Sequence, residues 1–161
     1  LDVLTDEERK KIFAEEMARK AKDPFLWAPA GGESMSDTCL RVDRVLSTLH
    51  RECSDKNVVI VCHGEVMQAF QVRLERITAS RWREIDASKH PFDNIHNCQI
   101  LQYTRRCPSS DKLHPRYEHM RLVCPWKPKL SRNDWIPIVR DCYTEPDLRA
   151  RFEAIPRLIA E

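Results

Sequence analysis

The chain has 161 residues, which is long enough for one domain with a hydrophobic core. Its 27 lysines and arginines nearly balance its 25 acidic residues, so net charge gives no general case for binding nucleic acid or an anionic membrane. No apolar run approaches the roughly 20 residues that a bilayer-spanning helix needs, and this excludes the ordinary membrane-spanning classes.

The first fifty residues predict two helices joined by an irregular loop. Thr5 and Glu8 form a capping-box pattern, which predicts a helix running to about residue 21. The next stretch, KDPFLWAPAGGES, contains prolines and a Gly-Gly pair that oppose regular structure, yet its Phe and Trp favour packing against the domain. Ser34 and Asp37 then repeat the capping pattern ahead of a second helix with apolar residues at helical spacing.

The middle of the chain predicts a buried strand followed by helices. Residues 57–62, NVVIVC, are continuous and β-branched, as is typical of a central strand covered on both faces. Helices are expected over residues 66–75 and around residues 80–86. Strands are expected within residues 97–105 and 117–124, and these two strands are interpreted as neighbours in a hairpin with a long loop.

The C-terminal part is expected to be mostly irregular. Residues 124–137, CPWKPKLSRNDWIP, are rich in Pro and Trp, and Thr144 is positioned to cap a last helix that Pro156 would kink or end. Together these elements predict an α/β fold. The expected organisation is a partial α/β domain over residues 1–125, with a tail and C-terminal helix, residues 126–161, packed on the same domain.

Cysteine usage bears on the compartment. The seven cysteines are odd in number and include no C-x-x-C pair. A secreted, disulfide-linked domain more often has an even number in loops, so we expect an intracellular, reducing compartment, cytoplasmic or organellar. The first residues resemble neither a signal peptide nor a transit peptide. Because the chain opens on Leu inside an apparent domain, we expect further residues upstream.

His63 and Gly64 end the expected central strand. Ligand sites in open α/β sheets gather beyond the carboxyl ends of strands, and the helix that follows would present free N–H groups to an anion. Gly64 would allow close approach of a phosphate, and His63 would donate to it or exchange protons. A structural histidine at the end of a strand is the alternative interpretation.

Glu33 directly precedes the Ser34 cap, in the Gly-Gly-Glu-Ser segment. A carboxyl group beside a bound phosphate is favoured in its protonated form and can donate that proton to a leaving alkoxide. The alternative is a favourable charge at the helix N-terminus. All three glycines of the chain lie in these two segments, which favours a functional interpretation of both.

The segment PAGGES, an Arg-Val six residues after it, and the strand ending in HGEVM resemble the second half of the histidine phosphatase superfamily, the phosphoglycerate mutase-like proteins. NCQILQY also resembles a late sheet strand of that family. The resemblance extends from about residue 5 to residue 105. It implies a three-layer sandwich with a mixed, mostly parallel central sheet flanked by helices.

The resemblance also implies roles for the site residues. Glu33 corresponds to the general acid and base, and His63 to the second pocket histidine, which steadies the transferring phosphoryl group with help from Gly64. The family begins with an Arg-His-Gly segment that supplies the nucleophilic histidine, and nothing in this chain matches it. The implied activity is therefore phosphomonoester hydrolysis through a phosphohistidine, with the nucleophile on an upstream segment. Phosphatase activity is favoured over mutase activity.

The sequence is also compatible with other functions. A non-catalytic phosphatase-like module in a larger assembly is the main alternative, with the Trp- and Pro-rich tail meeting a protein partner or a second copy. Basic residues around residue 75 and at residues 105–106 are mixed with acidic ones or few in number, so nucleic-acid binding is not favoured. The histidines and cysteines show no zinc-ligand spacing, and no cofactor or metal is expected. The expected ligand is a small phosphorylated substrate.

Overall fold

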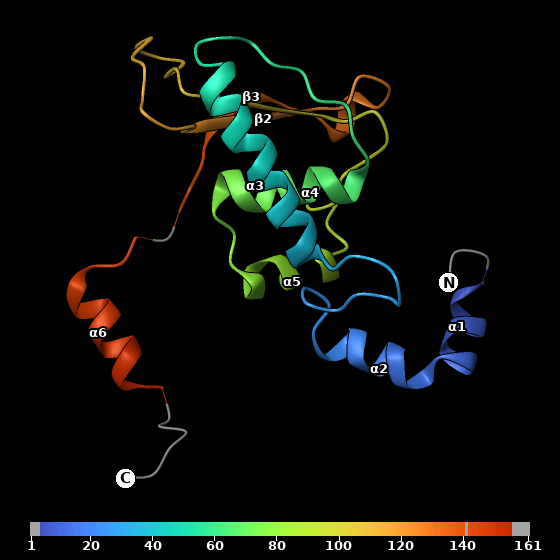
Figure 1. Cartoon of the computed structure of the whole chain (residues 1–161). Coiled ribbons are helices and arrows are strands. Elements are labelled where there is room, and N and C mark those ends of the chain that lie inside the picture. The colour runs from blue at the N-terminus through green and yellow to red at the C-terminus, as the bar shows by residue number, and fades with distance from the viewer. Residues whose placement is uncertain (1–3, 141, 156–161) are drawn as a thin grey trace.

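The computed structural model describes residues 4–140 and 142–155. It is an α/β structure in which α1 to α5 precede a small sheet and α6 follows it (Figure 1). The α-helices are α1 (Asp6–Ile12), α2 (Ala14–Lys22), α3 (Met35–Glu52), α4 (Gly64–Glu75), α5 (Ala79–Ala87) and α6 (Glu145–Glu153). The strands are β1 (Ile100–Thr104), β2 (His119–Val123) and β3 (Arg132–Pro137), and a short 3-10 helix, η1, spans Pro128–Leu130.

Local capping explains where most of these helices begin. Ser34 accepts a hydrogen bond from the backbone N–H of Asp37, and the Asp37 carboxylate accepts one from the backbone N–H of Ser34. The expected capping boxes at Thr5 and Thr144 are also present. The first expected helix, however, is divided into α1 and α2 at Phe13, whose backbone leaves the helical conformation. Pro156 lies outside the described residues.

The largest hydrophobic cluster lies between α3 and α4. Cys39 and Val42 from α3 meet Ala69, Phe70 and Val72 from α4. The indole of Trp82, on α5, closes the cluster, and the ring of Phe25 packs edge-on against it with a centroid separation of 5.3 Å. The loop before Ser34 therefore packs against the domain, as its aromatic residues predicted.

The sheet is antiparallel throughout, in the order β1-β2-β3. The expected hairpin is confirmed, because β1 pairs directly with β2 and places Leu101 opposite Leu122. The tail was expected to be irregular, and that was wrong over Arg132–Pro137, which forms β3 against β2. The Pro and charged residues of this stretch do not favour a strand, and the strand forms because it pairs with β2.

The clearest departure from expectation concerns residues 57–62. This stretch belongs to no strand or helix, and the chain between α3 and α4 is drawn as a loop in Figure 1. Val59 and Val61 are 89% and 95% exposed. A β-branched run becomes a strand only when neighbouring backbone accepts its hydrogen bonds, and no described strand pairs with this one. The described sheet is therefore not the mostly parallel one that the sequence predicted.

Two polar contacts join the sheet to the helices. The Tyr103 hydroxyl on β1 donates to the Glu75 carboxylate at the end of α4, at 2.7 Å. The Arg140 guanidinium donates to the Leu74 carbonyl at 3.1 Å and also contacts the Tyr117 carbonyl. Burial raises the pKa of Glu75 above its ordinary 4.5, although hydrogen bonds from Tyr103 and Gln71 oppose the shift. Burial also raises the pKa of Tyr103.

This raised pKa predicts a pH dependence of stability. The folded state holds the Glu75 proton more tightly than the unfolded state, so this group's contribution to the free energy of unfolding falls as pH rises above about 4.5. The Glu75→Gln variant keeps an acceptor for Tyr103 and removes the titration. We expect it to be at least as stable as the parent at neutral pH, with a flatter stability profile in denaturant titrations across the acid range. Glu84→Gln, on the surface of α5, is the matched control, and identical profiles for Glu75→Gln and the parent would contradict the prediction.

Candidate active site

Glu33 lies at the end of a tight turn that leads into α3. Gly31 has a φ of +72°, which side chains other than glycine rarely adopt, and a Cβ at Gly32 would lie 2.6 Å from the Pro29 ring. The Gly32 N–H donates to the Pro29 carbonyl at 2.9 Å and closes the turn. The turn therefore requires glycine at both positions, and it places Glu33 directly before α3.

The Glu33 carboxylate is exposed and paired with one cation. Its Oε2 accepts a hydrogen bond from Arg41 Nη2, two helical turns along α3, at 2.7 Å. Both side chains are about half exposed, so solvent screens the pair and its contribution to stability is at most about 1 kcal/mol. The pair does hold Glu33 over the first turns of α3, beside the buried cap residue Ser34.

His63 is the N-cap residue of α4. Its backbone carbonyl accepts from the Met67 N–H at 2.9 Å, and its exposed side chain makes no capping hydrogen bond. A Cβ added at Gly64 would meet only Ile95, at 4.0 Å. Packing in the described structure therefore gives no reason for glycine at position 64, in contrast to Gly31 and Gly32.

The structure sets the two candidate residues at the starts of a packed pair of helices. Besides the apolar cluster, the Arg73 guanidinium on α4 donates to Asp43 on α3 at 2.7 Å. Among the described residues, no hydrogen bond or ion pair joins Glu33 to His63. The start of α4 has no side-chain cap, so its first N–H groups and partial positive charge suit an anion. At the start of α3, the N–H groups of Ser34, Ser36 and Asp37 already donate to protein acceptors.

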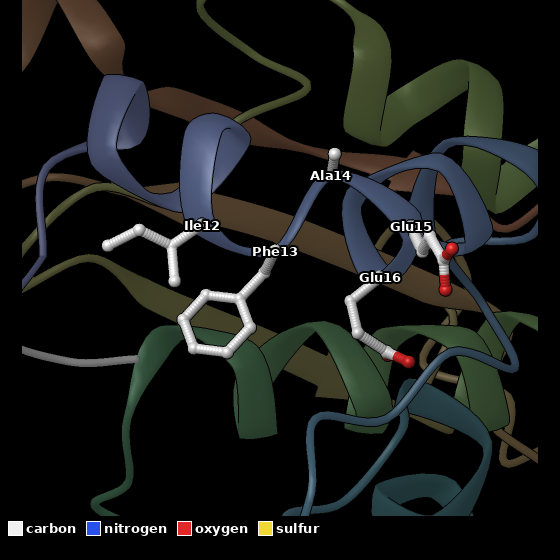
Figure 2. Close-up of a pocket in the computed structure, with 5 residues that line it drawn as sticks. All are labelled: Ile12, Phe13, Ala14, Glu15 and Glu16. Atoms are coloured by element: carbon white, nitrogen blue, oxygen red, sulfur yellow. The ribbon is translucent and has the colours of Figure 1, made fainter.

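Two hollows in the described part of the structure lie elsewhere. One is lined by Ile12, Phe13, Ala14, Glu15 and Glu16, and Figure 2 shows that these residues come from the end of α1 and the start of α2. A second lies over α2 and α5, with Trp27, Lys22 and Arg83 on its walls. Neither includes Glu33 or His63, and the first is a depression along one continuous segment with no polar groups converging from other elements. We therefore do not assign the candidate site to either hollow.

The described residues contain neither a metal-binding cluster nor a membrane-spanning helix. Within residues 4–140 and 142–155, no group of three or more His, Cys, Asp or Glu side chains is arranged to hold a metal ion. None of the helices in those ranges is both long and apolar enough to cross a bilayer. All seven cysteines are free thiols, two of them, Cys39 and Cys124, fully within the interior.

The comparison with protein families shows which family the chain belongs to. The model of the histidine phosphatase superfamily (branch 1) matches residues 1–111. The chain belongs to this superfamily. The matched range includes Glu33, Arg41, His63 and Gly64, and membership supports phosphatase-like or mutase-like activity in general. No curated protein and no solved structure matches the chain.

Cys107 is a chemically distinctive residue that the sequence analysis did not single out. It lies in the loop between β1 and β2, with its Sγ 3.3 Å from the Ser109 hydroxyl. Hydrogen bonds from the hydroxyls and backbone N–H groups of Ser109 and Ser110 lower the pKa of this thiol to about 6. In the sequence, the Cys-Pro-Ser-Ser run is the only feature that points to this geometry. The lowered pKa of the thiol depends on how the turn folds, which the sequence alone does not give.

The lowered pKa predicts selective alkylation. We expect Cys107 to react with iodoacetamide half-maximally near pH 6, because the thiolate is the reactive form. Replacing Ser109 with Ala removes the largest cause of the shift and should move the midpoint to higher pH. Peptide mass spectrometry after short alkylation pulses across a pH series would measure both midpoints. A midpoint that Ser109→Ala leaves unchanged would contradict the assignment.

Proposed function

We propose that the protein hydrolyses phosphomonoesters through a phosphohistidine intermediate, with Glu33 as general acid and base and His63 as a phosphate-stabilising histidine. The observation that carries this proposal is that two residues matching the superfamily's chemistry both lie at helix N-termini, on two helices packed against each other. The superfamily match spans both residues. Gly64 is proposed to leave room for a phosphoryl oxygen.

The nucleophile in this proposal comes from a segment N-terminal to Leu1. None of the six histidines of the chain follows an Arg as the family's nucleophile does. In the first step a histidine nitrogen attacks phosphorus, the ester P–O bond breaks, and Glu33 gives its proton to the departing alkoxide. Water then attacks phosphorus, the P–N bond to histidine breaks, Glu33 takes the proton from the water, and inorganic phosphate leaves.

The Glu33–Arg41 ion pair places a cation beside the proposed acid and base, with 2.7 Å between Arg41 Nη2 and Glu33 Oε2. A phosphate bound at the start of α3 would compete with Glu33 for this guanidinium. The Arg41 guanidinium, a ring nitrogen of His63 and the α4 N-terminus would also stabilise the equatorial oxygens in the transition state.

A non-catalytic phosphatase-like module is the second candidate. The observation that favours it is the exposure of both Glu33 and His63, since catalytic groups are usually enclosed when they react. In that case the segment after Cys124, with its exposed Trp126, is proposed to meet a protein partner or a second copy. We place either form of the protein in an intracellular, reducing compartment, and we expect no bound cofactor.

Two phosphomonoesters with different leaving groups test the proposed roles. Glu33→Gln should lower kcat/KM for glycerol phosphate by about 100-fold or more, because the alkoxide needs a proton. It should lower kcat/KM for p-nitrophenyl phosphate much less, because that leaving group departs without one. His63→Ala should lower both values by similar factors, since it acts on the phosphoryl group.

The controls are Glu52→Gln and His50→Ala, which alter exposed residues near the end of α3. Both should leave kcat/KM unchanged, and circular dichroism should show all four variants folded. Equal losses of kcat/KM on the two substrates in Glu33→Gln would exclude Glu33 as the general acid. Absence of turnover in the unaltered native protein would favour the non-catalytic module.

A further inference from the structure

The last helix, α6, carries an exposed apolar stripe. The helix has nine residues, and none of them is buried. Leu148 and Phe152 lie one turn apart on the same face, and the Phe152 side chain is 76% exposed. Ile155, directly after the helix, is exposed as well. A helix of this length is marginal in water unless an apolar face packs against other protein. The stripe formed by Leu148 and Phe152 is therefore a surface that needs a partner.

A second exposed apolar surface lies at the break between α1 and α2. Ile12 is 60% exposed, and with Phe13 and Ala14 it lines the first hollow described above. Figure 2 shows the Ile12, Phe13 and Glu16 side chains projecting to one side of the chain, with the Phe13 ring between the other two. Glu15 and Glu16 supply the charged groups of the lining. This hollow therefore has an apolar floor and an acidic rim.

Charge favours this hollow as the site for α6. Arg151 directly precedes Phe152 and borders the apolar stripe, with its guanidinium 3.9 Å from the centroid of the Tyr143 ring. A stripe bordered by a cation fits an apolar floor whose rim carries Glu15 and Glu16. The second hollow carries three basic residues and one acidic residue on its walls, so it would repel the same border.

The carboxylates of α6 are compatible with this placement. Asp147 belongs to the capping box at the start of the helix. Glu145 lies 3.6 Å from Arg149, one turn along the helix. Glu153 lies roughly half a turn around the helix from Arg151, on the side away from the basic border.

The two surfaces lie on opposite sides of one chain. In Figure 1, α1 and α2 extend from one side of the packed helices α3 and α4, and α6 extends from the other side. In this arrangement α6 does not cover the hollow of its own chain. A second copy of the chain supplies the matching surface for each, and two-fold symmetry would repeat the contact and cover both stripes and both hollows.

We infer that α6 of one copy docks its apolar stripe into the hollow between α1 and α2 of a second copy, and that this contact is made twice in a two-fold dimer. Phe152 meets Ile12 and Phe13, and Arg151 meets Glu15. Neither candidate site residue takes part in the contact, so the inference stands independently of the proposed function.

Sedimentation of the native polypeptide across a concentration series tests the contact. We expect a monomer–dimer equilibrium. Phe152→Ser and Phe13→Ser should each raise the dimer Kd by about 100-fold, roughly tenfold for each of the two contacts, because an aromatic anchor is lost from each. Val139→Ser, at a valine that is 87% exposed and outside both surfaces, should leave the Kd unchanged. A polypeptide that stays monomeric, or a dimer that neither Phe variant weakens, would overturn the inference.

Mixing the two Phe variants tests whether the contact joins different copies. A dimer of either variant alone has both contacts damaged. In the mixture, α6 of the Phe13→Ser copy can dock into the intact hollow of the Phe152→Ser copy, which restores one contact. The mixed dimer should therefore have a Kd about tenfold lower than the dimer of either variant alone. No gain in affinity on mixing would overturn the exchange of α6 between copies.

A charge reversal provides a second test, which holds even if Phe13→Ser does not fold. Glu15→Lys and Arg151→Glu should each weaken the dimer, and the two changes in one chain should restore it, because opposite charges again face each other across the contact. Arg151→Glu combined with Glu84→Lys, on the exposed surface of α5, is the matched control and should not restore it. A double variant that dimerises no better than the single variants would overturn the pairing of α6 with this hollow.

Discussion

Packing between α3 and α4 is the interaction on which the candidate site depends. Val42 and Cys39 from one helix and Phe70 and Ala69 from the other are removed from water together, and burial of this kind contributes on the order of 25 cal/mol per Å² of apolar surface. The helix starts next to Glu33 and His63 are held by that contact. Both site residues are themselves exposed, so their placement comes from the apolar residues behind them.

The sheet adds a second level of constraint. Tyr103 and Arg140 bind β1 and the end of the β3 segment to the last turn of α4. The contact with Tyr103 requires the Glu75 carboxyl to be buried, and burial disfavours its charged form, which raises its pKa. These contacts hold the sheet against the end of α4, whereas the side chains of Val59 and Val61 are almost fully exposed.

Local signals in the sequence predicted the helices well, because capping is a matter of residues three apart. Ser34 with Asp37 and Thr144 with Asp147 start α3 and α6 as expected. Strands were harder, since pairing is non-local. The β-branched run at residues 58–61 predicted a central strand, but no described strand pairs with it. Residues 132–137 contain Pro and charged residues that do not favour a strand, yet they pair with β2.

The candidate site shows the same difference between local signals, which the sequence reveals, and contacts that depend on the fold. Glu33 and His63 were predicted from short segments and from the family that those segments resemble, and the family match confirms the resemblance. Arg41 was not predicted to contact Glu33, because the ion pair depends on how a long side chain lies along two turns of α3. Cys107 was missed for a similar reason, since its lowered pKa depends on the fold of one turn.

In the proposed function, Glu33 and His63 serve one phosphate site. Titrating the native polypeptide with inorganic phosphate, while recording amide NMR spectra, tests this directly. We expect shifts of the His63–Gly64 and Glu33–Ser34 amides with a common saturation curve, and loss of both sets of shifts in His63→Ala. Shifts at only one of the two helix starts, or two curves with different midpoints, would contradict it.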